Sequence, residues 1–146
     1  MNIYNVKGIS MFPILKEGDL LIIKKYNFKK TRYKRNDIIV IKSPENSKKY
    51  FIKRLIGLPN EKIKNNITSL YINNTKIDKL YSNNSYTNTE ISTNYELSDN
   101  DFFVLGDNSK YSTDSRHFGP IKSSMIIGKV LLRIWPIHRL NFWFSI

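Results

Sequence analysis

The stretch of sequence that decides the fold reads Tyr50-Phe51-Ile52-Lys53-Arg54-Leu55-Ile56-Gly57. Most of its residues are β-branched, aromatic or otherwise apolar, which is typical of a strand that packs into a core. Because alternate residues of a strand share a face, Lys53 lies between Phe51 and Leu55 on an apolar surface. This lysine either extends its amine to water or is buried for a chemical reason.

Four more short runs of β-branched or aromatic residues indicate further strands. No stretch keeps an apolar period of 3.6 residues, so little helix is expected. The sequence therefore predicts a mainly β fold. Each run is bounded by Gly, Pro, Asn or Asp; the runs are Leu20–Ile23, Asp37–Lys42, Phe102–Leu105 and Ile126–Ile134.

The composition changes between Pro59 and Asp101, where Asn, Thr, Ser, Lys and Tyr dominate. Strand signals in this stretch are weak, as in Ser69-Leu70-Tyr71-Ile72. The apolar runs on either side would pair across it. We therefore expect one catalytic β core made of residues 1–58 and 102–146, with an inserted β/loop subdomain at 59–101.

Composition excludes several kinds of site. The chain has 146 residues, of which 40% are hydrophobic, enough to bury a core without disulfides. It contains no cysteine, so thiol nucleophiles and thiolate metal sites are ruled out. The two histidines, His117 and His138, lack the spacing of a zinc site. We expect neither a metal ion nor another cofactor.

The formal charge of +12 favours contact with a polyanion, either nucleic acid or an anionic membrane surface. A coding bias toward Lys, Asn, Ile and Tyr would give the same charge without any such contact. The densest basic run, Lys24-Lys25 followed by residues 29–35, is expected to be a surface loop. The C-terminal stretch from Leu140 to Ile146 is aromatic and follows Arg139, which suits a membrane interface as well as it suits core packing.

A serine on a constrained turn supplies a candidate nucleophile. Ser10 follows Gly8 and precedes Pro13, so its backbone is held outside a regular ladder. Burial of Lys53 would lower the pKa of its ammonium group toward neutrality, and the neutral amine could then take the serine proton. Ser10 and Lys53 together predict a Ser-Lys hydrolase.

A third polar stretch could orient these two groups. It begins at Gly106 after an apolar run and continues to Arg116, with hydroxyls and carboxylates able to hold a lysine and brace a loop. An ordinary surface turn would have a similar composition. His117 also lies nearby, but no acid-His-Ser pattern accompanies it.

Taken in order, the three stretches resemble the motifs of the type I signal peptidases. They read Ser10-Met11-Phe12-Pro13-Ile14-Leu15, then Lys53-Arg54-Leu55-Ile56-Gly57-Leu58-Pro59-Asn60-Glu61, then Gly106-Asp107-Asn108-Ser109-Lys110-Tyr111-Ser112-Thr113-Asp114-Ser115-Arg116. The resemblance implies a signal peptidase-like antiparallel β core, a partly open barrel, with a small inserted β subdomain. The sequence departs from the family pattern at Ile14, where threonine is usual, and at Asn60-Glu61, where Gly-Asp is usual.

The resemblance also implies roles for individual residues. Ser10 would be the nucleophile, Lys53 the general base, and Ser112 the group that orients the lysine amine. The Ser10 backbone N–H would hold the oxyanion, and Gly8 occupies the position of a second hydroxyl donor in some relatives. Two ion pairs would brace the loop, Arg54 with Asp107 and Arg116 with Asp114.

The implied substrate is a precursor protein bearing a signal or leader peptide, cut after small residues through an acyl-enzyme. It would add as an extended strand beside Val6 and the strand that carries Lys53. Shallow apolar pockets would set its specificity. Their expected wall residues are Tyr4, Val6, Met11, Leu15, Leu21, Phe51 and Ile52.

Only nine residues precede Ser10, whereas export-linked relatives carry one or two membrane spans there. We expect a membrane-associated enzyme with an extracytoplasmic active site if a span is supplied elsewhere; the alternative is a soluble cytoplasmic maturation protease dedicated to one precursor. A basic nucleic-acid module or self-cleaving regulator is a third hypothesis, but nine residues leave no room for its DNA-binding domain. We expect no nucleic-acid partner.

Overall fold

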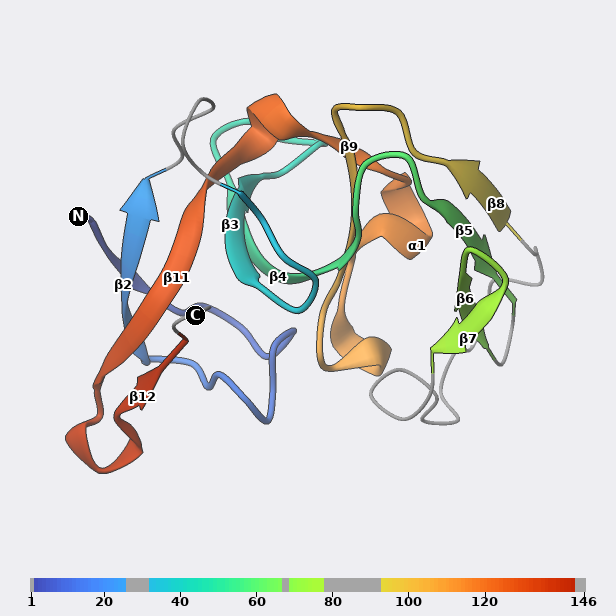
Figure 1. The fold of residues 1–146 in the computed structure, drawn as a ribbon. Coiled ribbons are helices and arrows are strands. Elements are labelled where there is room, and N and C mark those ends of the chain that lie inside the picture. Colours follow the sequence, from blue (N-terminus) through green and yellow to red (C-terminus); the bar gives the residue numbers. More distant parts are fainter. Residues whose placement is uncertain (1, 26–31, 67–68, 78–92, 144–146) are drawn as a thin grey trace.

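The computed structural model describes residues 2–25, 32–66, 69–77 and 93–143, which form two antiparallel sheets at opposite ends of the molecule (Figure 1). The larger sheet holds, in spatial order, β1 (Asn2–Asn5), β2 (Leu20–Lys25), β11 (Ile126–Trp135), β3 (Ile38–Lys42), β4 (Tyr50–Gly57), β9 (Asp101–Leu105) and β10 (Ile121–Lys122), with β12 (Asn141–Phe142) paired to β11. The smaller sheet holds β7 (Thr75–Ile77), β6 (Leu70–Ile72), β5 (Lys62–Asn65) and β8 (Thr93–Glu96).

Short helical turns occur only at the ends of strands in the described parts of the chain. The α-helix α1 (Ser115–Phe118) follows β9, and Asp114 caps it by accepting a hydrogen bond from the Arg116 N–H. The remaining turns are the 3₁₀ helices η1 (Ser109–Tyr111), η2 (Ser123–Met125) and η3 (Ile137–Arg139). The mainly β prediction is confirmed, and each of the five predicted runs forms a strand.

The central strand β3 explains how the larger sheet holds its core. Residues Ile38–Ile41 are all fully buried, and they alternate between two hydrophobic clusters on opposite faces. Ile38 and Val40 pack with Leu21 and Val130, whereas Ile39 and Ile41 pack with Leu55, Val104 and Ile126. A strand buried on both faces reads as a continuous apolar run, as this one does.

The larger sheet curls so that strands far apart in its order approach each other. Tyr4 on β1 and Tyr50 at the start of β4 meet edge to face with ring centroids 6.2 Å apart. Three strands, β2, β11 and β3, lie between β1 and β4 in the sheet. The curled sheet therefore leaves a concave space between β1 and β4.

The smaller sheet shares a core with the larger one. Ile63, Leu70 and Ile72 of this sheet pack with Ile56 of β4 and Phe103 of β9. The described strands of the smaller sheet occupy residues 62–96, inside the stretch expected to be an insertion. The division into 1–58, 59–101 and 102–146 stays a prediction.

The sequence analysis missed β1, β10, β12 and the short helices. Strand β1 reads Asn-Ile-Tyr-Asn, which carries little apolar signal, and its pairing to β2 forms it. Lys24 and Lys25, expected in the basic loop, instead end β2 because they pair with Lys129 and Gly128 of β11. The rest of that loop, at 29–35, and the tail from Leu140 fall partly outside the described residues. In the described part of the chain, no helix is at once long and apolar enough to cross a membrane.

Candidate active site

Ser10 lies on a turn that two buried side chains anchor. Met11 and Leu15 are 2% and 0% exposed and pack into the core beside Leu21. Within the turn, the Phe12 N–H donates to the Ile9 carbonyl at 3.0 Å. Ser10 itself is only partly buried and lines the concave space. The fold thus holds the backbone of this turn while leaving the serine accessible.

The loop after β9 is fastened to the serine turn through Asn108. Its backbone N–H donates to the Ser10 carbonyl at 2.9 Å. Its side-chain Nδ2 donates to the Ile9 carbonyl at 3.0 Å. Two separate hydrogen bonds therefore fix the turn against the loop that carries the other polar residues of the site.

Lys53 is buried, with 2% of its surface exposed. It lies on β4 opposite Ile39 of β3, and its Nζ is 5.3 Å from the centre of the Phe51 ring. Burial lowers the pKa of the Lys53 ammonium group to about 8; Asp114 and Asp107 act in the opposite direction, and Arg116 adds to the lowering. The ammonium form still dominates at pH 7, and about half of Lys53 is neutral at pH 8.

A chain of hydrogen bonds orients the lysine amine. Lys53 Nζ donates to Ser112 Oγ at 2.9 Å, and that hydroxyl donates to Asp114 Oδ2 at 2.7 Å. Asp114 also accepts from the Gly106 N–H at 2.9 Å and pairs with Arg116, with Nη2 2.7 Å from Oδ2. Burial alone would raise the pKa of the Asp114 carboxyl, but Arg116, Gly106 and Ser112 together hold it below its ordinary value.

Gly106 is the point where the serine turn meets the lysine cluster. A Cβ atom built on it would lie 2.2 Å from Ser112 Oγ and 2.6 Å from the Ser10 carbonyl oxygen. Real Cβ atoms do not approach other heavy atoms so closely, so a side chain would push these two residues apart. Glycine therefore allows Ser10 and the Ser112–Lys53 pair to approach the same spot.

The loop is braced by a second ion pair. Arg54 donates from Nε to Asp107 Oδ1 and from Nη2 to Asp107 Oδ2, both at 2.7 Å. The two side chains are 12% and 10% exposed, and this bidentate geometry restricts their relative motion. Arg54 also donates to the Asn36 carbonyl at 3.0 Å, which ties the loop to the start of β3.

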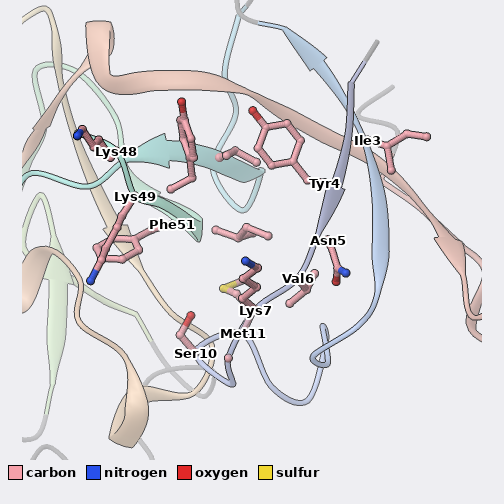
Figure 2. Close-up of a pocket in the computed structure, with 14 residues that line it drawn as sticks. Ile3, Tyr4, Asn5, Val6, Lys7, Ser10, Met11, Lys48, Lys49 and Phe51 are labelled. Carbon is pink, nitrogen blue, oxygen red and sulfur yellow. The ribbon is translucent and has the colours of Figure 1, made fainter. Parts of the chain in front are cut away.

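A groove of about 630 Å³ begins at Ser10 and runs between the β1 side and β4 (Figure 2). Five of the seven expected wall residues line it: Tyr4, Val6, Met11, Phe51 and Ile52. Leu15 and Leu21 do not; both are fully buried behind the groove, where they pack with Val6 and Met11. Leu15 ends the serine turn and Leu21 lies on β2, and both side chains point into the core instead of the groove.

Gly8 lines the groove near Ser10 and has φ of +75°. A Cβ atom there would meet no other atom within 4 Å, so space is available. The left-handed backbone is what disfavours a side chain at this position. A serine that donates a second hydrogen bond to an oxyanion would need a different backbone here.

Three charged residues that the sequence analysis did not assign to the site support the serine turn from the other side. Buried Asp19 pairs with Arg133 and Arg139, with N–O distances of 3.2 and 3.0 Å. Arg133 also donates to the Ile14 carbonyl at 2.6 Å. The available signals were an acid directly after Glu17-Gly18 and two arginines interrupting an apolar C-terminal stretch.

The two departures from the motifs have structural consequences. Asn60 has φ of +66°, a conformation that asparagine tolerates better than most residues, so it can stand where glycine is usual. Glu61 accepts from the Leu58 N–H at 2.8 Å and pairs with Arg35. The Ile14 side chain is exposed, and its carbonyl serves as the acceptor for Arg133.

Among the described residues, no group of three or more His, Asp or Glu side chains is placed to hold a metal ion. The serine turn and the cluster of Lys53, Ser112 and Asp114 meet at Gly106. The arrangement offers a hydroxyl that lines a groove and a buried amine with lowered pKa, which belongs to the cluster that meets the serine turn at Gly106. These groups can perform nucleophilic acyl transfer.

Comparison with known proteins agrees with this geometry. The family model described as signal peptidase, peptidase S26 matches residues 1–135. The chain is 37% identical to signal peptidase I of Bacillus caldolyticus, covering 97% of this chain and 83% of that protein. It is 30% identical to signal peptidase IB of Staphylococcus aureus strain MRSA252, covering 97% and 82%.

A solved structure is similar as well. The crystal structure of a signal peptidase I from Enterococcus faecalis V583 superposes with a TM-score of 0.55 at 31% sequence identity. The match covers 68% of this chain and 97% of that one. Fold, sequence and site geometry agree, and the chain belongs to the signal peptidase family, peptidase S26.

Proposed function

We propose that this chain is a serine endopeptidase that removes signal peptides from precursor proteins, with Ser10 as nucleophile and Lys53 as general base. The single observation that carries the proposal is the burial of Lys53. Its amine is held by Ser112, and the pKa of its ammonium group is lowered to about 8. A lysine that only stabilised the surface would keep its charge in water.

In the proposed reaction, neutral Lys53 takes the proton of the Ser10 hydroxyl while Oγ attacks the carbonyl carbon of the substrate. The Ser10 backbone N–H donates to the developing oxyanion. The C–N bond then breaks, the amine leaves with the proton from Lys53, and an ester remains on Ser10. Water repeats the sequence: Lys53 takes its proton, and the acid product leaves as Ser10 regains a hydrogen.

The groove supports an extended substrate. Val6 on one side and Ile52 on the other present apolar side chains between Ser10 and the Tyr4–Tyr50 contact. We infer that the chain preceding the cut lies along this groove, with a small side chain at the residue before the cut. A bulkier residue there would clash beside Met11, whose side chain is already packed into the core.

Synthetic precursor peptides test this function. Wild type should cut after Ala, Gly or Ser, and replacing that residue with Phe or Lys should reduce kcat/KM at least about 100-fold, since the misplaced carbonyl leaves the range of the nucleophile. The Ser10→Ala variant is the matched control and should release no product. Efficient cutting after Arg, Lys or Phe would contradict the proposed specificity.

We also propose that the enzyme works at an anionic membrane surface. Four large apolar side chains near the end of β11 are at least half exposed: Trp135, Ile137, Leu140 and Phe142. Arg139 lies among them and also donates to the carbonyl of exposed Ile14 at 3.3 Å. Aromatic and aliphatic side chains beside basic ones suit the interface of an anionic bilayer.

Vesicle sedimentation distinguishes this from a soluble maturation protease. We expect binding to vesicles with anionic lipid, weakened by salt. The Ile137→Ser/Phe142→Ser variant should bind less, whereas Tyr111→Ser, which changes an exposed aromatic side chain outside this group, should bind as wild type does. Equally negligible partition into anionic and neutral vesicles would contradict membrane association and favour the soluble alternative.

A further inference from the structure

The groove that begins at Ser10 is basic as well as apolar. Lys7, Lys48 and Lys49 line it, and none of its 14 lining residues is acidic. In the part of the chain that the structure describes, none of these three lysines forms a salt bridge with a carboxylate. Their positive charge is therefore available to whatever occupies the groove.

Lys49 is in register with the strand that carries the general base. The Ser43 N–H donates to the Lys49 carbonyl at 2.9 Å, which continues the β3–β4 ladder past Tyr50. Because side chains alternate along a strand, Lys49 shares a face with Phe51 and Lys53. Four residues of extended chain separate Lys49 from Lys53, which is about 13 Å.

The two ends of the groove differ in chemistry. Near Ser10 the walls are Val6, Gly8 and Met11, with one lysine, Lys7, beside them. Figure 2 shows Lys48, Lys49 and Phe51 on the side of the groove opposite Asn5 and Val6. An extended peptide that places its scissile carbonyl at Ser10 would bring its residues farther from the cut toward Lys48 and Lys49.

We propose that Lys48 and Lys49 bind an acidic side chain of the substrate, located about four to six residues upstream of the cut. This inference rests on the proposed function, because it needs the chain before the cut to lie along the groove. The spacing of about 13 Å matches about four residues of an extended peptide, and a flexible lysine stem extends the reach by one or two more. Lys7 adds positive charge nearer the nucleophile.

The experiment uses pairs of precursor peptides that differ by Glu or Gln at one position, scanned from six residues before the cut to three after it. Glu should raise kcat/KM about 3- to 10-fold over Gln at one or more of positions four to six upstream, which is the range that one or two partly exposed ion pairs supply. The preference should shrink toward 1 as salt is raised to about 1 M.

Reversing the charge of the two lysines tests their electrostatic role, because a purely structural role would not invert the preference between acidic and basic peptides. In the Lys48→Glu/Lys49→Glu variant the preference for Glu should disappear, and a peptide with Lys at the same position should become the better substrate. Lys64→Gln, on β5 of the smaller sheet, is the matched control and should keep the wild-type preference. Thermal unfolding of each variant confirms that it is folded.

Peptide binding to an inactive variant tests this inference independently of the proposed function. Ser10→Ala protein should bind the labelled Glu peptide about 3- to 10-fold more tightly than the Gln peptide, by fluorescence anisotropy. Equal binding, equal cleavage, or a preference only at positions after the cut would overturn the acidic-residue site. If charge reversal changes only binding to anionic vesicles, the lysines contact lipid, and the inference is wrong. Absence of cleavage of every peptide would overturn the proposed function, while the anisotropy ratio would still decide the inference.

Discussion

The two halves of the active site are built in opposite ways. Lys53, Ser112 and Asp114 are 2%, 5% and 0% exposed and are joined by side-chain hydrogen bonds. Ser10 lies on a partly open turn whose neighbours Ile9 and Phe12 are 47% and 46% exposed. In the proposed mechanism, burial of the general base lowers its pKa, whereas the nucleophile stays accessible to a peptide.

The connection between these halves is made by the main chain. Asn108 donates its N–H to the Ser10 carbonyl, and Gly106 lies against both the Ser10 carbonyl and the Ser112 hydroxyl. The loop after β9 therefore sets the distance between the turn and the buried cluster. Lys53, the proposed base, is held on a strand, and this one loop connects it to the turn that carries the proposed nucleophile.

Removing either reacting group should have the largest effect. Ser10→Ala loses the nucleophile and Lys53→Met loses the base, so each should lower kcat/KM by at least about 10⁴-fold. The measurement is peptide cleavage followed by mass spectrometry, with circular dichroism to verify folding. A well-folded Ser10→Ala protein that keeps more than about 1% of wild-type activity would remove Ser10 from the mechanism.

Gly106→Ala should break the connection between the halves. The added methyl cannot fit 2.2 Å from Ser112 Oγ, so the serine turn and the lysine cluster must separate. We expect a loss of about 10²- to 10³-fold in kcat, because misplacement by about 1 Å is that costly, and a loss of about 1–3 kcal/mol in the free energy of unfolding. Unchanged kcat with lowered stability would show that the loop does not position the site.

Ser112→Ala should weaken the base without removing it. Lys53 loses its 2.9 Å hydrogen-bond partner, so its amine is oriented less well toward Ser10. We expect kcat to fall about 10- to 100-fold with little change in KM, since the hydroxyl does not line the groove. Ser112→Thr, which keeps a hydroxyl, should recover part of the rate. A variant that raises KM alone would mean that Ser112 contacts substrate instead.

The buried charge of Lys53 should lower the free energy of unfolding near neutral pH. The pKa of Lys53 is about 8 in the folded chain and 10.5 when the side chain is exposed. Between pH 8 and pH 10.5 the unfolded chain therefore binds more protons than the folded chain, and the free energy of unfolding rises with pH. At pH 7 both states are protonated, and the cost of the buried charge is fully present. Lys53→Met should therefore raise the free energy of unfolding at pH 7 by about 1–3 kcal/mol.

Urea denaturation of wild type and Lys53→Met from pH 7 to pH 10.5 measures that difference. The gap between the two proteins should narrow as pH rises through this window. The control is Lys64→Met, because the Lys64 side chain is exposed; its stability should differ from that of wild type by the same amount at every pH. Lys129 would be unsuitable as a control because it pairs with Asp37. A Lys53→Met protein less stable than wild type at every pH would contradict the account.

The sequence could predict the strands and the residue types of the site because both depend on local patterns. The apolar run at β3 fixes a strand buried on both faces, and the motif around Lys53 places that lysine between apolar neighbours. The mainly β architecture follows and is confirmed. The roles of Ser10, Lys53 and Ser112 stay predictions, supported by the distances reported above, whereas the two expected ion pairs, Arg54 with Asp107 and Arg116 with Asp114, are present in the structure.

Other parts of the site depend on contacts between segments far apart in the chain. Asp19 and Arg133 are 114 residues apart in sequence, and nothing local indicates their pairing. Leu15 and Leu21 were expected on the groove wall, but the curl of the sheet turns them into the core. Two of the groove lysines, Lys48 and Lys49, lie in the turn before β4, and Lys7 follows β1; at such positions lysine usually means only a solvated surface.

The pH dependence of kcat/KM for peptide cleavage tests the central claim, the Ser10–Lys53 pair, most directly, because it reports the ionisation of essential groups in the free enzyme. Since Lys53 must be neutral to accept the Ser10 proton, kcat/KM should be low at pH 6 and rise with pH through an apparent pKa of about 8. A profile that is flat from pH 6 to pH 9, or that falls across this range, would contradict Lys53 as the general base.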